Sequence, residues 1–134
     1  MNEAASTDGP VLVISDDMCS HWKKEVEPKL FDKMISTSRH IGKGMSFVFL
    51  SQSIVQLPTS LRRNTTCFVI FGATSFAESE LIWRDISTVD KKTFNKIFRS
   101  ATQKQFGFLV AVNDKGQLRF FDSFEKEFEI DWSN

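Results

Sequence analysis

Tyrosine is missing from this 134-residue chain, cysteine is rare, and the positive and negative charges balance. The two cysteines, Cys19 and Cys67, cannot build a disulfide framework, so a reducing compartment is the default expectation. Lys+Arg and Asp+Glu both number 17, which gives a formal net charge of +0. This balance argues against a uniformly basic nucleic-acid binder and against a highly charged disordered chain, but it allows local charged patches.

Long hydrophobic runs are also missing. No run approaches the ~18–20 apolar residues that a membrane-spanning helix needs. Residues 1–10 are polar and acidic, without the basic start and apolar centre of a signal peptide. We therefore expect an intracellular protein that is not secreted and has no membrane partner.

Short hydrophobic runs, by contrast, recur along the chain in an α/β order. Runs that are apolar on both faces predict buried strands; they lie at 11–14, 45–50 and 67–71. Helical patterns lie at 22–38, 75–86 and 90–101, with capping signals at Ser75 and at Ser87 or Thr88. The turn residues 113–116 predict a hairpin. We expect a mostly parallel sheet flanked by helices, with a C-terminal β-hairpin.

The chain divides by composition into a flexible leader at 1–10, an α/β region at 11–122 and an acidic tail at 123–134. Within the α/β region, polar residues follow two of the expected strands. Asp16 and Asp17 end the first strand, and Gln52 follows the second. Because two strands joined by a helix form a crossover unit, they should be adjacent and parallel, with these residues at one sheet edge.

Ligands of open α/β sheets bind beyond the carboxyl ends of the strands. A carboxylate fixed there can hold Mg²⁺ beside nucleotide phosphates, and a second one can orient or deprotonate water. On this interpretation Asp16 serves the metal and Asp17 is the base. Gln52 could sense a phosphate, because its amide both donates and accepts hydrogen bonds. The alternatives are a solvated strand end and an exposed loop.

Basic residues form two further groups. Arg39, Arg62 and Arg63 are candidates for an anion contact or an arginine finger, the alternative being ordinary surface arginines. A run that no acidic residue interrupts could face DNA phosphates or be a solvated helix face; it contains Lys91, Lys92, Lys96, Arg99 and Lys104.

Two other patterns fail. The segment 41–45 is not a phosphate loop, because Thr37 and Gly44 stand where the pattern needs glycine and Ser/Thr. Cys19 and His21 have no partner pair at zinc-site spacing.

The order of the surviving motifs resembles the C-terminal half of viral genome-packaging ATPases of the FtsK–HerA superfamily. The type is that of poxviruses, giant viruses and Polinton-like elements. The most specific parts are the Asp16-Asp17 strand end, the Arg39-His40 turn and the strand that leads to Gln52. The resemblance implies a partial RecA-like P-loop NTPase fold and a ring that uses ATP and Mg²⁺ to move double-stranded DNA into capsids. It also implies a location in the host cytoplasm, a viral factory or the nucleus.

Carried over to this sequence, the resemblance makes Asp16 the Walker B acid, which binds Mg²⁺ directly or through water. Asp17 becomes the catalytic acid and Gln52 the polar sensor. Arg39, Arg62 and Arg63 match basic positions near the subunit boundary, and which of them is the finger stays open.

The departure from the family is at the Walker A motif, which should precede Asp16. The 15 residues before Asp16 contain no Gly-x-x-x-x-Gly-Lys-Ser/Thr. Without that loop we expect the chain alone to bind nucleotide poorly and to be inactive. It would then act with a missing N-terminal half or within a homo-oligomeric ring. The alternatives are a non-catalytic α/β module that binds a protein partner, such as intact ATPase subunits, and an unrelated small α/β domain.

Overall fold

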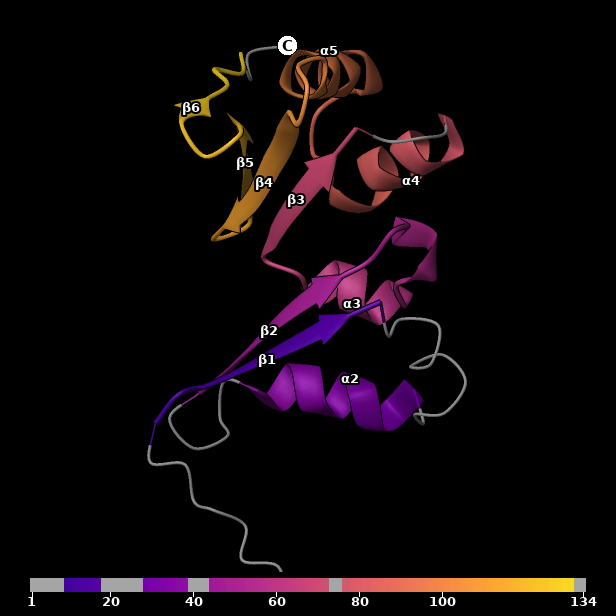
Figure 1. Ribbon diagram of the computed structural model, residues 1–134, viewed down its shortest axis with the longest axis vertical. Coiled ribbons are helices and arrows are strands. Elements are labelled where there is room, and N and C mark those ends of the chain that lie inside the picture. The colour runs from indigo at the N-terminus through magenta and orange to yellow at the C-terminus, as the bar shows by residue number, and fades with distance from the viewer. Residues whose placement is uncertain (1–8, 18–27, 39–43, 73–75, 132–134) are drawn as a thin grey trace, which may run out of the picture. The chain divides into compact units, whose positions relative to one another are not determined.

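A computed structural model describes residues 9–17, 28–38, 44–72 and 76–131 (Figure 1). The chain divides into two compact units, Met1–Asn64 and Thr65–Asn134. None of the described helices is long and apolar enough to cross a membrane.

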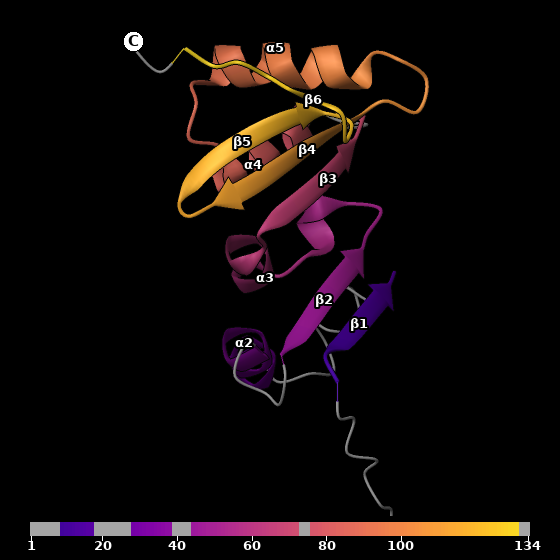
Figure 2. The same ribbon diagram turned by 90° about the vertical axis from the view of Figure 1, so that its left-hand side faces the viewer.

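The first unit is built on two parallel strands, β1 (Val11–Asp16) and β2 (Met45–Leu50). Their register runs from Val11 opposite Met45 to Asp16 opposite Leu50. The predicted adjacency and parallel direction are therefore confirmed. Between the strands in the chain comes α2 (Pro28–Thr37), which runs alongside them (Figures 1 and 2). After β2 follow the 3₁₀ turn η2 (Ile54–Gln56) and α3 (Thr59–Asn64).

The helix α2 begins at Pro28, whereas the sequence pattern predicts a start near Trp22, which lies outside the described residues. Proline suits a first helical position, because the N–H it lacks would have no partner in the helix. At the other end, the Thr37 hydroxyl donates to the Lys33 carbonyl at 2.6 Å. Such side-chain bonds compete with the backbone ladder and favour termination.

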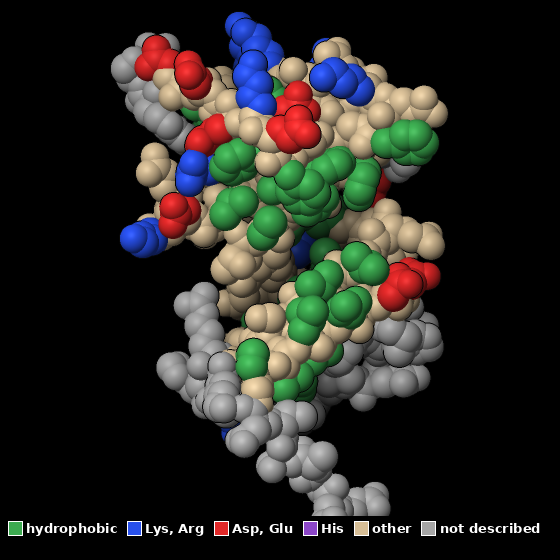
Figure 3. Space-filling model, turned by 60° about the vertical axis from the view of Figure 1, so that its left-hand side comes forward, with side chains coloured by type: hydrophobic (Ala, Val, Ile, Leu, Met, Phe, Trp, Pro, Cys, Tyr) green, Lys and Arg blue, Asp and Glu red, His purple; other side chains and the backbone are tan. Residues whose placement is uncertain are grey.

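One face of the β1–β2 pair is exposed, which corrects the expectation of strands buried on both faces. Leu12 and Ile14 are 59% and 61% exposed, and Val48 and Leu50 are 42% and 48% exposed. We call these four residues the aliphatic strip. Side chains alternate between the faces of a strand, and no element in the described part of the first unit covers this face. Figure 3 shows the strip as a band of hydrophobic side chains, with acidic side chains at one end.

The second unit is an antiparallel sheet in the order β3-β4-β5-β6, with two helices. This differs from the mostly parallel sheet that the sequence suggests, because β4 returns antiparallel to β3 after two helices. Its elements are β3 (Cys67–Phe71), α4 (Phe76–Ile86), α5 (Lys91–Thr102), β4 (Phe108–Asp114), β5 (Gln117–Asp122) and β6 (Lys126–Glu127). Ser75, the expected cap of α4, lies outside the described residues.

The predicted hairpin joins β4 to β5. Lys115 and Gly116 both adopt positive φ, 53° and 88°, as the tight turns that match strand twist require. The Gly116 N–H donates to Asn113 Oδ1 at 2.9 Å. Part of the acidic segment then returns along β5, where Arg119 makes two bonds to the Glu127 carboxylate at 2.7 and 2.6 Å.

The core of the second unit lies between α5 and the sheet. Buried residues of α5 face buried residues of β4 and β5. They are Phe94, Ile97, Phe98 and Ala101 on the helix and Leu109, Val110, Ala111 and Phe120 on the strands. Phe94 and Phe120 meet edge to face with ring centroids 6.1 Å apart, an arrangement that the ring quadrupoles favour.

The cap of α5 is Asp90, in place of the expected Ser87 or Thr88. The Asp90 carboxylate accepts from the N–H groups of Lys92 and Thr93 at 2.9 and 3.0 Å. Ser87 instead bonds within its own turn, where its hydroxyl accepts from the Val89 N–H at 3.2 Å. A hydrogen bond with the Thr93 side chain, followed by one with its backbone, holds the pKa of Asp90 below its ordinary value of 3.8.

Replacing Asp90 by alanine is expected to lower Tm at pH 7 by several degrees (about 4–8 °C). Because the folded-state pKa is depressed, the ionised carboxylate stabilises the fold above the unfolded-state pKa. That contribution disappears as pH falls through the folded-state pKa. The gap in Tm between wild type and Asp90→Ala should therefore narrow below about pH 4. Thermal melts by circular dichroism across pH measure it. Asp90→Asn, which keeps an acceptor, should lose less, and equal Tm values for wild type and Asp90→Ala at pH 7 contradict the capping role.

Candidate functional site

The carboxyl ends of β1 and β2 bring the predicted acidic residues and Gln52 to one sheet edge. Asp16 lies opposite Leu50 in the register, and the Asp17 N–H donates to the Leu50 carbonyl at 3.0 Å. The pairing thus reaches the second aspartate. Gln52 follows Leu50 by two residues, and all three polar side chains are exposed. Two carboxylates and an amide therefore lie at the same edge of the sheet.

Strand alternation gives the two residues before Asp17 different surroundings. Ser15 is buried, with 6% exposure, while Asp16 is exposed on the opposite face. That face is the one that carries Leu12 and Ile14, so the Asp16 carboxylate stands at the end of the aliphatic strip. Whatever covers the strip would also approach Asp16.

Asp17 adopts a left-handed backbone conformation, with φ of 52°. Aspartate tolerates this region better than most residues, because its short side chain can bond locally. Backbone conformations of this kind are enriched where a structure must hold a functional group in place. Here the conformation turns the chain sharply out of β1 directly after Asp16.

The loop after β2 is held by a short serine network. The Ser51 hydroxyl donates to the Ser53 carbonyl at 2.8 Å, and Ser53 caps η2 by accepting from the Val55 N–H at 3.3 Å. Gln52 lies between these two serines. Sequence reasoning treats them only as signs of an exposed loop, and the Ser-x-Ser spacing is the signal that indicates their capping role.

The three candidate arginines have different positions. Arg62 donates from Nη1 to the carbonyls of Ile54 and Leu57 at 3.2 and 2.9 Å, and from Nη2 to Thr59 Oγ1 at 3.3 Å. Its guanidinium therefore ties η2 to the start of α3. Arg63 is exposed on α3, and Arg39 lies outside the described residues. Of the adjacent pair, Arg63 is the residue better placed to reach another molecule.

The donor set at this edge fits a magnesium ion shared with a nucleotide. Mg²⁺ keeps several waters and is bound by one or two carboxylates together with substrate phosphates. Asp16 and Asp17 supply that number. Among the residues that the structure describes, no group of three or more His, Cys, Asp or Glu could hold a metal by itself. Cys19, His21 and residues 41–43 of the rejected 41–45 segment lie outside those residues.

Solved structures with a similar fold come from Sulfolobus turreted icosahedral viruses. The genome packaging NTPase B204 from Sulfolobus turreted icosahedral virus 2, in complex with ATP-γS, is 21% identical with a TM-score of 0.61. The match covers 81% of this chain and 50% of that one. The same NTPase in complex with AMP is 20% identical, with a TM-score of 0.60 and coverage of 80% and 50%.

A third structure, of B204 described as the DNA-packaging ATPase from Sulfolobus turreted icosahedral virus, is 20% identical with a TM-score of 0.61. The match covers 81% of this chain and 50% of the B204 chain. The chain thus spans about half the length of the solved structures that it matches. These likenesses confirm the partial P-loop NTPase fold that the motif order suggested.

No curated protein matches the chain. Residues 1–119, however, match the family described as Poxvirus A32 protein. The match includes both strands of the candidate site, α5, β4 and the first three residues of β5, and it confirms the resemblance to the poxvirus type. The chain belongs to the Poxvirus A32 protein family.

Proposed function

We propose that this chain is the Walker B half of a viral DNA-packaging ATPase. The observation that carries the proposal is the parallel register of β1 and β2, which brings Asp16, Asp17 and Gln52 to one edge. Family membership and the fold of the packaging NTPases support it. The phosphate-binding loop would come from a further half of the fold, because the 134 residues contain no Gly-x-x-x-x-Gly-Lys-Ser/Thr.

Each site residue has a separate task in this proposal. Asp16 would hold Mg²⁺ through a carboxylate oxygen, directly or through water, and the bound ion would neutralise charge at the phosphates. Asp17 accepts the proton of the attacking water, and the Gln52 amide senses the terminal phosphate or positions that water. Arg63 and Arg39 are the candidates for the finger, since Arg62 is engaged with its own loop.

A metal titration tests the site in the chain as it exists. Mn²⁺, a paramagnetic probe of Mg²⁺ sites, is expected to broaden the amide NMR signals of residues 15–17 and 50–53 first. Asp16→Asn should abolish that selective broadening. The matched control Asp114→Asn removes an exposed carboxylate from the second unit and should change nothing there. Broadening that starts elsewhere, or that survives in Asp16→Asn, contradicts the proposal.

Hydrolysis by the isolated chain is expected at the rate of a buffer blank, because the sequence lacks the Gly-x-x-x-x-Gly-Lys-Ser/Thr loop whose backbone amides cradle phosphates. A coupled phosphate-release assay with ATP and Mg²⁺ measures it. Turnover that disappears in Asp17→Asn would show a complete nucleotide site within these residues and overturn the assignment of a half-site.

A non-catalytic binding module is the second candidate, and the exposed aliphatic strip favours it. Parallel sheets are normally covered on both faces, so the strip suits contact with another polypeptide. The Mn²⁺ titration separates the candidates. A folded chain with no metal response at Asp16 leaves the binding module, whereas a selective response supports the ATPase half-site.

A further inference from the structure

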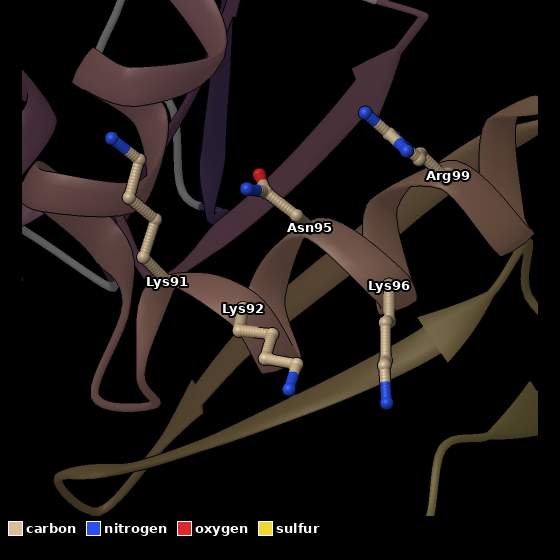
Figure 4. Close-up of a pocket in the computed structure, with 5 residues that line it drawn as sticks. All are labelled: Lys91, Lys92, Asn95, Lys96 and Arg99. Carbon is tan, nitrogen blue, oxygen red and sulfur yellow. The ribbon is translucent and has the colours of Figure 1, made fainter.

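The outer side of α5 carries four cations around one surface depression. Lys91, Lys92, Asn95, Lys96 and Arg99 line it, and we call this set the α5 basic face. Figure 4 shows Lys92 and Lys96 extending from one side of the helix, one turn apart, while Lys91, Asn95 and Arg99 extend from the other. The inner side of α5 is packed in the core through Phe94 and its neighbours. The helix thus has a fixed position and an accessible charged surface.

Most of this charge has no counterpart among the residues that the structure describes. Lys91 pairs with Glu80 at 2.5 Å. Within the part of the chain that the structure describes, Lys92, Lys96 and Arg99 have no carboxylate oxygen within 4.0 Å of their charged nitrogens. Arg84 and Arg119 of the same unit do have such partners. Three cations on one helix are left for an external anion.

The placement of these cations also costs the isolated helix stability. Lys92 and Lys96 are four residues apart, so their like charges repel by roughly 0.2–0.5 kcal/mol in typical helices. Lys91 and Lys92 stand in the first turn, next to the positive end of the helix dipole, where the Asp90 cap is the acid in place and the turn itself holds none. A bound polyanion would relieve both effects.

The spacing of the cations matches a nucleic-acid backbone. Lys92 and Arg99 are seven residues apart, which is about 10 Å along a helix that rises 1.5 Å per residue. One strand of duplex DNA presents a phosphate about every 3.4 Å along its axis. The α5 basic face therefore spans roughly three phosphates of one strand.

An anionic membrane fits this surface less well. Helices that lie on membranes bury an apolar face in the lipid. The apolar face of α5 is instead buried in the protein core, with Phe94 and Ala101 at 0% exposure.

The type of cation also bears on sequence readout. Lysines are point charges that contact phosphates without reading sequence.

We propose that the α5 basic face binds the phosphates of double-stranded DNA, independently of base sequence. The inference rests on the proposed packaging function and names the surface of this chain that touches the DNA. Lys92, Lys96 and Arg99 supply the contacts, and Lys91 remains paired with Glu80.

The test is fluorescence anisotropy of a labelled duplex of about 20 base pairs, titrated with the full chain between roughly 20 and 200 mM salt. The triple variant Lys92→Ala/Lys96→Ala/Arg99→Ala is expected to bind about tenfold or more weakly at low salt. The slope of log K against log salt should fall in magnitude by roughly 2–3, since each lost phosphate contact removes about 0.9.

The matched control is Lys33→Ala/Lys115→Ala/Lys126→Ala, which removes three exposed cations elsewhere. It should keep the wild-type slope. A second variant, Lys92→Gln/Lys96→Gln/Arg99→Gln, removes the charges but keeps polar side chains closer in length than alanine, and far-UV circular dichroism checks that all variants fold. Loss of binding in the glutamine variant supports the charge interpretation.

Several outcomes overturn the inference: no binding by wild type at low salt, equal losses in the triple variant and the control, or an unchanged slope. Tighter binding to vesicles of anionic phospholipid than to duplex, lost in the triple variant, assigns the face to a membrane instead. The Mn²⁺ response at Asp16 reports on the first unit, whereas the α5 basic face belongs to the second unit. A normal Mn²⁺ response with an unchanged DNA slope therefore removes the DNA surface and leaves the proposed function standing.

Discussion

Replacing Phe94 by alanine is expected to cost the fold of the second unit about 3–5 kcal/mol of unfolding free energy. The Phe94 side chain is fully buried, and its ring packs on Phe98 with centroids 6.0 Å apart and edge to face on Phe120. Alanine removes the buried ring surface and leaves a cavity between α5 and the sheet. A unit of this size typically has a stability of roughly 5 kcal/mol, so most of it should be lost.

Urea unfolding followed by far-UV circular dichroism measures this loss. Phe106→Ala is the matched control, because it makes the same chemical change at a side chain that is 83% exposed. It should change the midpoint little. A midpoint for Phe94→Ala close to wild type would show that α5 does not pack on β4 and β5 as described. Since α5 also carries the basic face, Phe94→Ala should weaken DNA binding under conditions in which the second unit unfolds.

The sequence was a good guide to the strands that hold the candidate site. Short apolar runs located β1, β2 and β3, and the crossover rule predicted that Asp16 and Gln52 would share an edge. Hairpin chemistry at Asn113 and Gly116 was equally local, because positive φ at the turn depends on those residues themselves. The strand positions and the hairpin turn need no knowledge of distant parts of the chain, and the pairing of β1 with β2 needs only the crossover rule.

Other features depend on partners that are remote in the chain. An apolar run predicts a strand with two covered faces, but it does not say which polypeptide supplies the cover. Leu12 and Ile14 show this difference: the apolar run predicts that they are covered, but both are exposed in the described part of the first unit. The direction of β3 relative to β4 is set by the path through α4 and α5, which no single residue encodes.

Competition between similar local signals explains the remaining differences. Ser87, Thr88 and Asp90 are all suitable caps for α5, and the turn that Ser87 makes with Val89 leaves Asp90 as the cap. Arg62 was a candidate arginine finger because of its charge and its position after the second strand. Its bonds to the carbonyls of Ile54 and Leu57 arise from the turn between β2 and α3, which charge and spacing alone could not predict.

Replacing Gly107 by alanine is the second substitution with a large expected effect. The chain passes close to the end of α5 here, and the Gly107 N–H donates to the Lys104 carbonyl at 2.9 Å. A Cβ on residue 107 would lie 2.4 Å from the carbonyl oxygen of Ala101 and 3.0 Å from that of Lys104. Both are backbone atoms, so the clash cannot be relieved by a side-chain rotation. Either the last turn of α5 or the start of β4 must move.

That movement should cost about 1–3 kcal/mol, the range for forced overpacking, and it should lower Tm by roughly 4 °C or more. Gly72→Ala is the control, since a Cβ there meets only Thr102 Cβ at 3.9 Å, an ordinary contact. Thermal melts of both variants measure the difference. If Gly107→Ala has the same Tm as wild type, the described short distance between residue 107 and the Ala101 carbonyl is wrong. If Gly107→Ala has a lower Tm while Gly72→Ala does not, the result supports the close packing of the backbone at residue 107 against the end of α5, which only glycine allows.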